Sequence, residues 1–184
     1  MDLVEYREYY LNQIKATAIE EERYAYEVFI DLVADIMVSD WSLLSSIEQC
    51  HFSVPTGTRA FKSMLIHAGT LELSTNTINL LYADFNDIEI ENITNTDINT
   101  HSAQMINFVE NAVKGYFDNG EQSNPAVQLG LSIRNSVDDI YKIHLFIIST
   151  NQLSKRVKSI DWDDVEIKGK TYKVELDVID IEKI

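Results

Sequence analysis

Two segments of this sequence carry apolar side chains on both faces of an extended chain, and they constrain the fold more than any other feature. Residues 141–149 (YKIHLFIIS) and 76–84 (NTINLLYAD) place leucine, isoleucine and aromatic side chains at both alternating positions. A strand with one wet face would carry a polar side chain at every second position, whereas a strand covered on both faces does not. The sequence therefore predicts a sheet with helices packed on both of its sides.

The remaining segments predict an α/β (α+β) fold with a mixed β-sheet of about five strands flanked by helices. Apolar residues at spacings of three and four predict helices at 3–18 and 22–38, a helical hairpin that precedes the sheet. We expect strands at 49–54, 59–67 and 76–84, a turn at 68–70, helices from Thr96 or Asp97 to about 117 and at 125–137, a strand at 141–149, a short helix at 151–158, and a closing strand or hairpin at 165–178. The second and third strands are expected to pair antiparallel. A chain of 184 residues suits a single domain, 1–184, with the hairpin at 1–40 and the core at 41–184.

The charge balance restricts the class of partner. Thirty acidic and fifteen basic residues give a net charge of −15, the opposite of what phosphate contacts require of a free-standing nucleic-acid binder. Lys155, Arg156 and Lys158 form the one dense basic cluster of the sequence. A single cysteine, Cys50, excludes an internal disulfide and a thiolate zinc cluster. We expect a cytoplasmic protein, because the sequence shows no signal-peptide pattern and no apolar run of roughly 20 residues.

The stretch from Ser63 to Val113 has no lysine or arginine but seven acidic residues. A phosphate-handling site built within this stretch would have no cation of its own to neutralise developing charge. The sequence also lacks a glycine-rich phosphate loop, a Gly-x-Ser-x-Gly elbow and a pair of histidines four residues apart. These features exclude several common classes of enzyme without identifying a reaction.

Acidic residues at the end of the 76–84 strand are candidates for binding a metal ion. Asp84 and Asp87 lie where that strand ends, and Glu27 on the preceding helix would add a carboxylate from the neighbouring layer. Oxygen ligands of this kind suit magnesium, which keeps several of its waters. Acidic residues at a strand end also serve as solvated turn residues, so this alternative stays open.

Four segments carry a pattern typical of one protein family. Residues 78–85 (INLLYADF) match a Leu-x-Leu-x-x-x-Asp-Phe strand, and residues 124–126 (NPA) match a helix start. Residues 143–158 match a strand and loop followed by Leu-Ser-x-Arg-Val. Residues 178–183 (VIDIEK) are similar to a closing Trp-Asp-Ile-Glu-Arg run. In this order and spacing, the chain from about Glu20 to Ile184 resembles the N-terminal domain of the abortive-infection phage-resistance proteins, the AIPR family. In that family this domain is followed by a larger C-terminal region, so we expect the N-terminal part of a longer protein.

The resemblance implies a fold like that of restriction endonucleases, in which a helix glutamate and strand acids bind a divalent metal near a lysine. Glu27 matches the family's helix glutamate, and Asp84 matches its third-strand aspartate. The second-strand Asp-Gly-aromatic pattern is replaced by Ala-Phe-Lys at 60–62, so its aspartate is missing and Lys62 is the nearest cation. Phosphodiester cleavage needs acids for the ion and a cation for developing charge. The resemblance therefore implies an antiphage-defence domain with a degenerate nuclease-like fold.

Under this interpretation the domain is a sensing, oligomerisation or partner-binding module without a cofactor. Its partner would be another protein, a C-terminal region of its own chain, or a second copy. The alternative is an active nuclease that uses Glu27, Asp84 and Lys62, with Mg²⁺ held by Glu27, Asp84 and Asp87, and it requires these side chains to converge. An acidic mimic of nucleic-acid charge is a third alternative, and it rests on the net charge of −15 alone.

Overall fold

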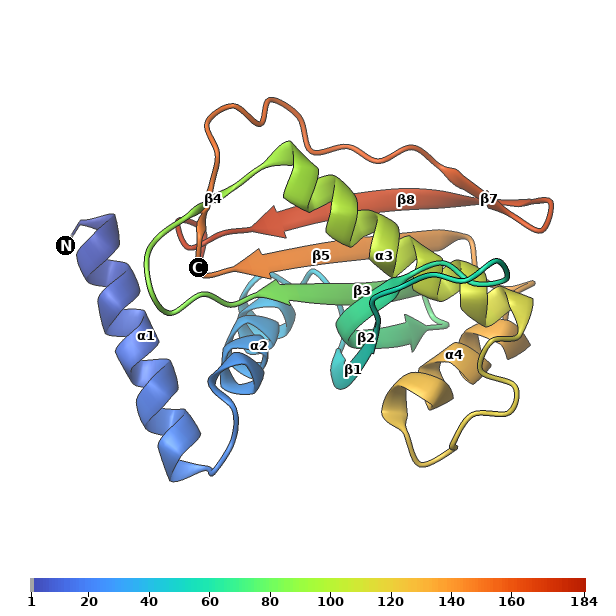
Figure 1. The fold of residues 1–184 in the computed structure, drawn as a ribbon, viewed down its shortest axis with the longest axis horizontal. Coiled ribbons are helices and arrows are strands. Elements are labelled where there is room, and N and C mark those ends of the chain that lie inside the picture. Colours follow the sequence, from blue (N-terminus) through green and yellow to red (C-terminus); the bar gives the residue numbers. More distant parts are fainter. Residues whose placement is uncertain (1) are drawn as a thin grey trace.

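The computed structural model describes residues 2–184 and shows a mixed sheet with helices on both faces (Figure 1). The helices are α1 (Leu3–Glu20), α2 (Ala25–Asp35), which continues into a π-helical turn (Ile36–Asp40), α3 (Asn95–Lys114) and α4 (Pro125–Asn135). The strands are β1 (Glu48–Val54), β2 (Met64–Glu72), β3 (Thr77–Asp84), β4 (Asn92–Ile93), β5 (Lys142–Ser149), β6 (Gln152–Leu153), β7 (Val165–Ile167) and β8 (Lys170–Ile179). The predicted α+β class is confirmed, and the likeness to restriction endonucleases stays a prediction.

Six strands form the main sheet, in the order β1-β2-β3-β5-β8-β7. The three central strands β3, β5 and β8 are parallel, and the outer pairs β1–β2, β2–β3 and β7–β8 are antiparallel. Strands β4 and β6 form a separate parallel pair beside the main sheet. The antiparallel pairing expected of the second and third strands is confirmed.

The central strands separate two hydrophobic clusters. Along β5, Leu145 and Ile147 pack with α3 and α4 in one cluster, whereas Phe146 and Ile148 pack with α1 and α2 in the other. All four of these side chains are buried. This strand is therefore covered on both faces, as the sequence predicts.

Local hydrogen bonds determine where the helices begin. The Thr94 hydroxyl accepts from the Asp97 N–H, and the Asp97 carboxylate accepts from the Thr94 N–H at 2.8 Å, which together form a capping box. The cap is therefore Thr94 in place of the predicted Thr96 or Asp97, and helix α3 starts at Asn95. Asn124 caps α4, which begins at Pro125 as predicted.

Strand β2 differs from the prediction because its glycine lies within the strand. Residues 68–70, which were expected to form a turn, pair with β3, and the expected strand at 59–67 is instead found at 64–72. A Cβ atom built on Gly69 would lie 2.6 Å from Cδ2 of Leu129, so the glycine allows α4 to approach the sheet closely. The turn follows at Leu73–Asn76, where Asn76 has a φ of 54°.

The short helix predicted at 151–158 is wrong. Residues 152–153 form β6 and pair with β4, and the N–H groups of Gln152 and Ser154 donate to the carbonyls of Glu91 and Ile93. These contacts with a distant segment use the backbone groups that a helix would need. The closing hairpin is confirmed: β7 and β8 are joined by Lys168 and Gly169, both at positive φ.

Candidate functional site

The carboxyl ends of the three parallel strands meet at one edge of the sheet. The register places Asp84 at the end of β3 opposite Ser149 at the end of β5, and Ile148 opposite Ile179 of β8. In Figure 1 the arrowheads of β3, β5 and β8 point toward the end of the molecule where α1 lies. Ligand sites of α/β sheets lie at such an edge.

The Asp84 carboxylate is held by two side chains of the neighbouring strand and loop. Its Oδ2 atom accepts from Oγ of Ser149 at 2.7 Å and from Nδ2 of Asn151 at 3.0 Å. The amide oxygen of Asn151 in turn accepts from the Glu91 N–H at 2.9 Å. Ser149 and Asn151 are both buried. Asp84 therefore joins β3 to the segment after β5, and one of its two oxygens is committed to that task.

A small hollow of about 110 Å³ opens beside Asp84 on the α3 side of the sheet. The rings of Tyr82 and His101 both line it and stack directly on each other, with centroids 3.7 Å apart and planes 10° apart. Burial, followed by the charges of Asp84 and Asp97, raises the pKa of Tyr82 to about 12, so its phenol stays protonated. Pockets for nucleotide-sized ligands are typically 300–1,000 Å³, so this hollow suits a few waters or a small ion.

Arg7 of α1 is buried and secures the helical hairpin to the same edge. Its Nε donates to the carbonyl of Thr150 at 2.8 Å, and Nη2 donates to the carbonyl of Asn86 at 2.7 Å. Burial lowers the pKa of this guanidinium, and the charge of Asp87 opposes that shift. Sequence reasoning missed Arg7. The spacing of Arg7 from Tyr10 and Ile14 could have identified it, because this spacing places its charged side chain on the buried face of the helix.

Asp180 completes the edge at the end of β8. Its Oδ2 accepts from the Leu153 N–H at 2.7 Å, and the side chain is 2% exposed. The Ile181 N–H donates to the carbonyl of Asn151 at 3.1 Å. Three of the four segments that resemble the AIPR family therefore contact one another: the Asp84 strand, the 149–154 segment and the closing 178–183 run are joined by hydrogen bonds.

Glu27 and Asp84, the two residues matched to the family's metal ligands, lie on opposite sides of the sheet. Glu27 is in the first turn of α2, which packs on the face formed by Leu81 and Ala83. Asp84 lines the hollow beside α3 on the other face. The Glu27 carboxylate accepts instead from the N–H of Tyr24 at 3.2 Å, within its own helix start.

The other two candidates are also placed apart. Asp87 forms an ion pair with Lys15 of α1 at 3.0 Å, and the bond from Lys15 lowers the pKa of Asp87. Lys62 pairs with Glu110 of α3 at 2.8 Å, and Lys114 shares the same carboxylate. Within residues 2–184, no group of three or more His, Cys, Asp or Glu side chains is arranged to hold a metal ion.

A histidine fills a gap between two strands. Strand β2 pairs with β3 only over residues 68–72, and Nδ1 of His67, just before this stretch, accepts the Ala83 N–H at 3.1 Å. Burial, together with His51 and His101, lowers the pKa of His67 to about 4. Although the rings of His51 and His67 lie 5.1 Å apart, the Nδ1 lone pair of His67 is already engaged, which leaves its proton on Nε2. His51 and His67 are therefore not arranged to bind a metal ion together.

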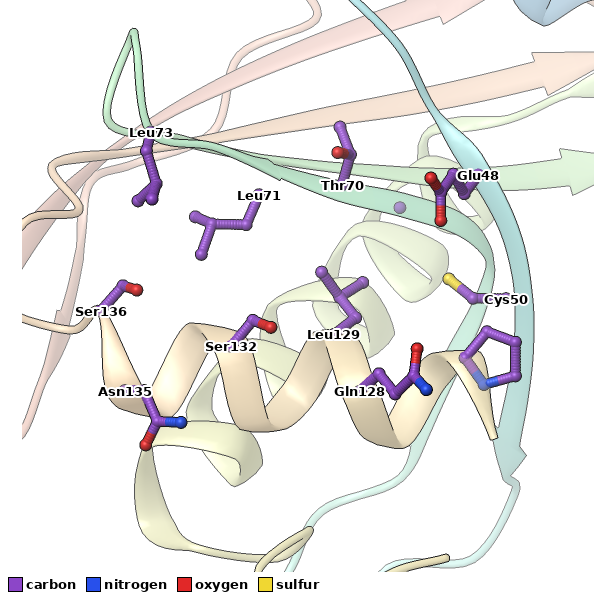
Figure 2. A pocket seen from close by; sticks show the side chains of 12 residues that line it. Glu48, Cys50, Thr70, Leu71, Leu73, Gln128, Leu129, Ser132, Asn135 and Ser136 are labelled. Atoms are coloured by element: carbon purple, nitrogen blue, oxygen red, sulfur yellow. The ribbon is translucent and has the colours of Figure 1, made fainter. Parts of the chain in front are cut away.

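A groove of about 440 Å³ separates the β1–β2 part of the sheet from α4 (Figure 2). Leu71 and Leu129 line its apolar side, and Gln128 and Ser132 of α4 add polar groups. Cys50 lies at one end, where burial, followed by the charge of Glu48, raises its pKa to about 12. At neutral pH this thiol is protonated and inert, so the groove holds no cysteine nucleophile.

Comparison with known proteins identifies the family. The family model of the abortive infection phage resistance protein N-terminal domain matches residues 29–184. This range begins within α2 and continues to the last residue. No curated protein and no solved structure matches the chain. None of the helices within residues 2–184 is long and apolar enough to cross a membrane. Because the match covers most of the 184 residues, the chain belongs to the abortive infection phage resistance protein N-terminal domain family.

Proposed function

We propose that this domain serves abortive-infection defence as a partner-binding module that does not itself cut nucleic acid. The family provides the link to phage resistance. The observation that carries the proposal is the separation of Glu27 and Asp84 by the sheet, with Asp84 bound to Ser149 and Asn151. An ion shared by these two acids would need them on one side.

The surface near α1 supports a protein as the partner. Val4 and Tyr9 on α1 are 52% and 54% exposed, and Ile88 on the adjoining loop is 83% exposed. Val4 and Ile88 line the same hollow of about 570 Å³, together with Leu11. Large apolar side chains gathered at an exposed hollow are typical of protein contact sites.

The rival function is a metal-dependent nuclease based on Glu27, Asp84 and Lys62. To act, it would have to bring Lys62 away from Glu110 and move α2 across the sheet. The first change would break an exposed ion pair, and the second would break buried packing, since Val28, Phe29 and Ile30 of α2 are almost completely buried. The packing therefore favours the binding module.

A cleavage assay tests this proposal. The purified chain is incubated with single-stranded and duplex DNA and RNA in Mg²⁺ or Mn²⁺, beside the Asp84→Asn and Glu27→Gln variants. Asparagine and glutamine preserve the size of each side chain, so loss of activity would not simply reflect unfolding. We expect no metal-dependent cleavage by any of the three proteins. Cleavage by the wild type that is lost in either variant would overturn the proposal.

A further inference from the structure

An uncommon concentration of free positive charge lies beside a polar hollow. Lys155, Arg156 and Lys158 form no ion pair with any carboxylate in the part of the chain that the structure describes. Many of the other cations are paired, for example Lys62 with Glu110 and Arg134 with Asp118. In a chain of net charge −15, these three cations within four residues form a local patch of positive charge.

Two of these cations line the hollow, which has a volume of about 640 Å³. It lies between the start of α3 and the segment after β6, and its lining is polar with one apolar side chain: Asn92, Thr94, Asn95, Thr96, Gln152, Ser154, Lys155, Arg156 and Val157. No Asp or Glu belongs to this lining. Its volume falls within the range of small-ligand sites.

The acids nearest to the hollow already accept hydrogen bonds from other groups. The Asp97 carboxylate accepts from the N–H and hydroxyl of Thr94, and the Glu182 carboxylate accepts from Nε2 of Gln152 at 2.6 Å. Both carboxylates keep their negative charge, but within residues 2–184 neither forms an ion pair with Lys155 or Arg156, whose side-chain N–H groups remain free for a ligand.

Backbone donors add to these two cations. The N–H groups of Asn95 and Thr96, in the first turn of α3, have no acceptor among residues 2–184. Both residues line the hollow, as do Lys155 and Arg156. A pair of cations and unsatisfied N–H donors within one hollow is suited to an anion that accepts several hydrogen bonds.

We propose that this hollow binds the phosphate group of a small phosphorylated compound. A phosphate monoester carries nearly two negative charges at neutral pH, which match the charges of Lys155 and Arg156. The planar guanidinium can bind two phosphate oxygens at once, and Lys155 adds a point charge. No aromatic side chain lines the hollow, so a nucleobase would not be stacked and different bases would bind alike.

The remainder of the surface favours a small compound over a nucleic acid. A polynucleotide would bring many phosphates along a protein with thirty acidic and fifteen basic residues, and most of those phosphates would meet repulsion. A single phosphorylated metabolite places its charge in the hollow alone.

Titration of the ¹⁵N-labelled protein tests the proposal with inorganic phosphate, AMP, ATP and a single-stranded 20-nucleotide DNA as the probes. We expect phosphate, AMP and ATP to shift the backbone amide signals of Asn95 and Thr96. The Lys155→Ala/Arg156→Ala double variant should weaken AMP binding about tenfold or more, since it removes two charge-assisted contacts. Lys158→Ala is the matched control, because Lys158 is equally free but does not line the hollow, and it should change affinity less than about twofold.

Three results would overturn the proposal: no shift of the Asn95 and Thr96 amides with any probe, equal losses in the control and the double variant, or tighter binding of the oligonucleotide than of AMP. Dispersed amide spectra of both variants establish that they are folded, so loss of binding is interpretable. Cleavage of nucleic acid is a separate readout, and failure of either proposal is therefore recognised independently of the other.

Discussion

At the scale of single residues, His67 links a side chain directly to the backbone of the sheet. Its Nδ1 accepts the N–H of Ala83 where the pairing of β2 with β3 has ended, and two residues of β1, Cys50 and His51, lie opposite it. The imidazole thus replaces a strand as the partner of a backbone donor. This role requires the neutral ring, because protonation of Nδ1 removes the acceptor.

The pH dependence of stability should report this requirement. The pKa of His67 is about 4 in the folded protein and about 6.5 when unfolded, so the unfolded chain binds the proton more tightly. The contribution of His67 is complete above about pH 6.5 and is lost as the pH falls to about 4, by roughly 3 kcal/mol. His67→Gln keeps an acceptor that does not titrate, and the acidic residues common to both proteins cancel in the comparison.

We therefore expect the free energy of urea unfolding to fall more steeply between pH 6.5 and pH 4 for the wild type than for His67→Gln. The difference should approach roughly 3 kcal/mol at pH 4. Parallel curves for the two proteins would show that His67 does not carry this proton linkage.

At the scale of helices and strands, α4 packs against the turn that follows α3 through a glycine contact that fixes their spacing. A Cβ atom on Gly130 of α4 would overlap the ring of Phe117. That ring is held among Phe52, Phe108 and Tyr116, with centroids 5.2, 5.0 and 5.0 Å away. Because three aromatic neighbours surround it, Phe117 has little freedom to move aside.

Gly130→Ala should destabilise the protein, although alanine forms helices better than glycine by about 1 kcal/mol. Overpacking a rigid core costs about 1–3 kcal/mol, so after the gain in helix propensity we expect a net loss of up to roughly 2 kcal/mol in chemical denaturation. In a Phe117→Leu background the smaller side chain leaves room, and the cost of Gly130→Ala should shrink. A Gly130→Ala variant more stable than the wild type would mean that helix propensity outweighs the contact.

The same packing explains which elements the sequence could predict. Strands β3 and β5 have apolar residues on both faces, and Pro125 marks a helix start, so local pattern was sufficient there. Gly69 predicted a turn because a glycine in isolation suggests one, and only the approach of Leu129 explains its place in a strand. Residues 151–158 were predicted as a helix because their strand partner, β4, is about 60 residues earlier in the chain.

At the scale of the whole molecule, the site depends on contacts that no local pattern contains. Asp84 was predicted at a strand end and lies there, yet the residues that bind its carboxylate are Ser149 and Asn151. Glu27 and Asp84 both resemble family ligands, but the sequence does not say which face of the sheet receives α2. The structure places them on opposite faces, so these two acids do not form a shared metal site.

The net charge of −15 also acts on the molecule as a whole. Salt screens two opposing effects: it weakens ion pairs, which stabilise the fold, and it weakens repulsion among unpaired acids, which destabilises it. The ion pairs here are largely exposed; for example, the side chains of Lys15 and Asp87 are 44% and 46% exposed, and such pairs contribute little. With twice as many acidic as basic residues, repulsion is the larger effect.

Raising sodium chloride from 0.05 to 0.5 M should therefore increase the free energy of unfolding, on the order of 1 kcal/mol. The measurement is urea denaturation at pH 7, and potassium chloride at the same ionic strength should give the same increase, because screening does not depend on the identity of the cation. An increase confined to one of the two salts would instead indicate specific ion binding. A decrease in stability would show that the ion pairs outweigh the repulsion, and that the excess of acids is spread widely enough over the surface to cost the folded state little.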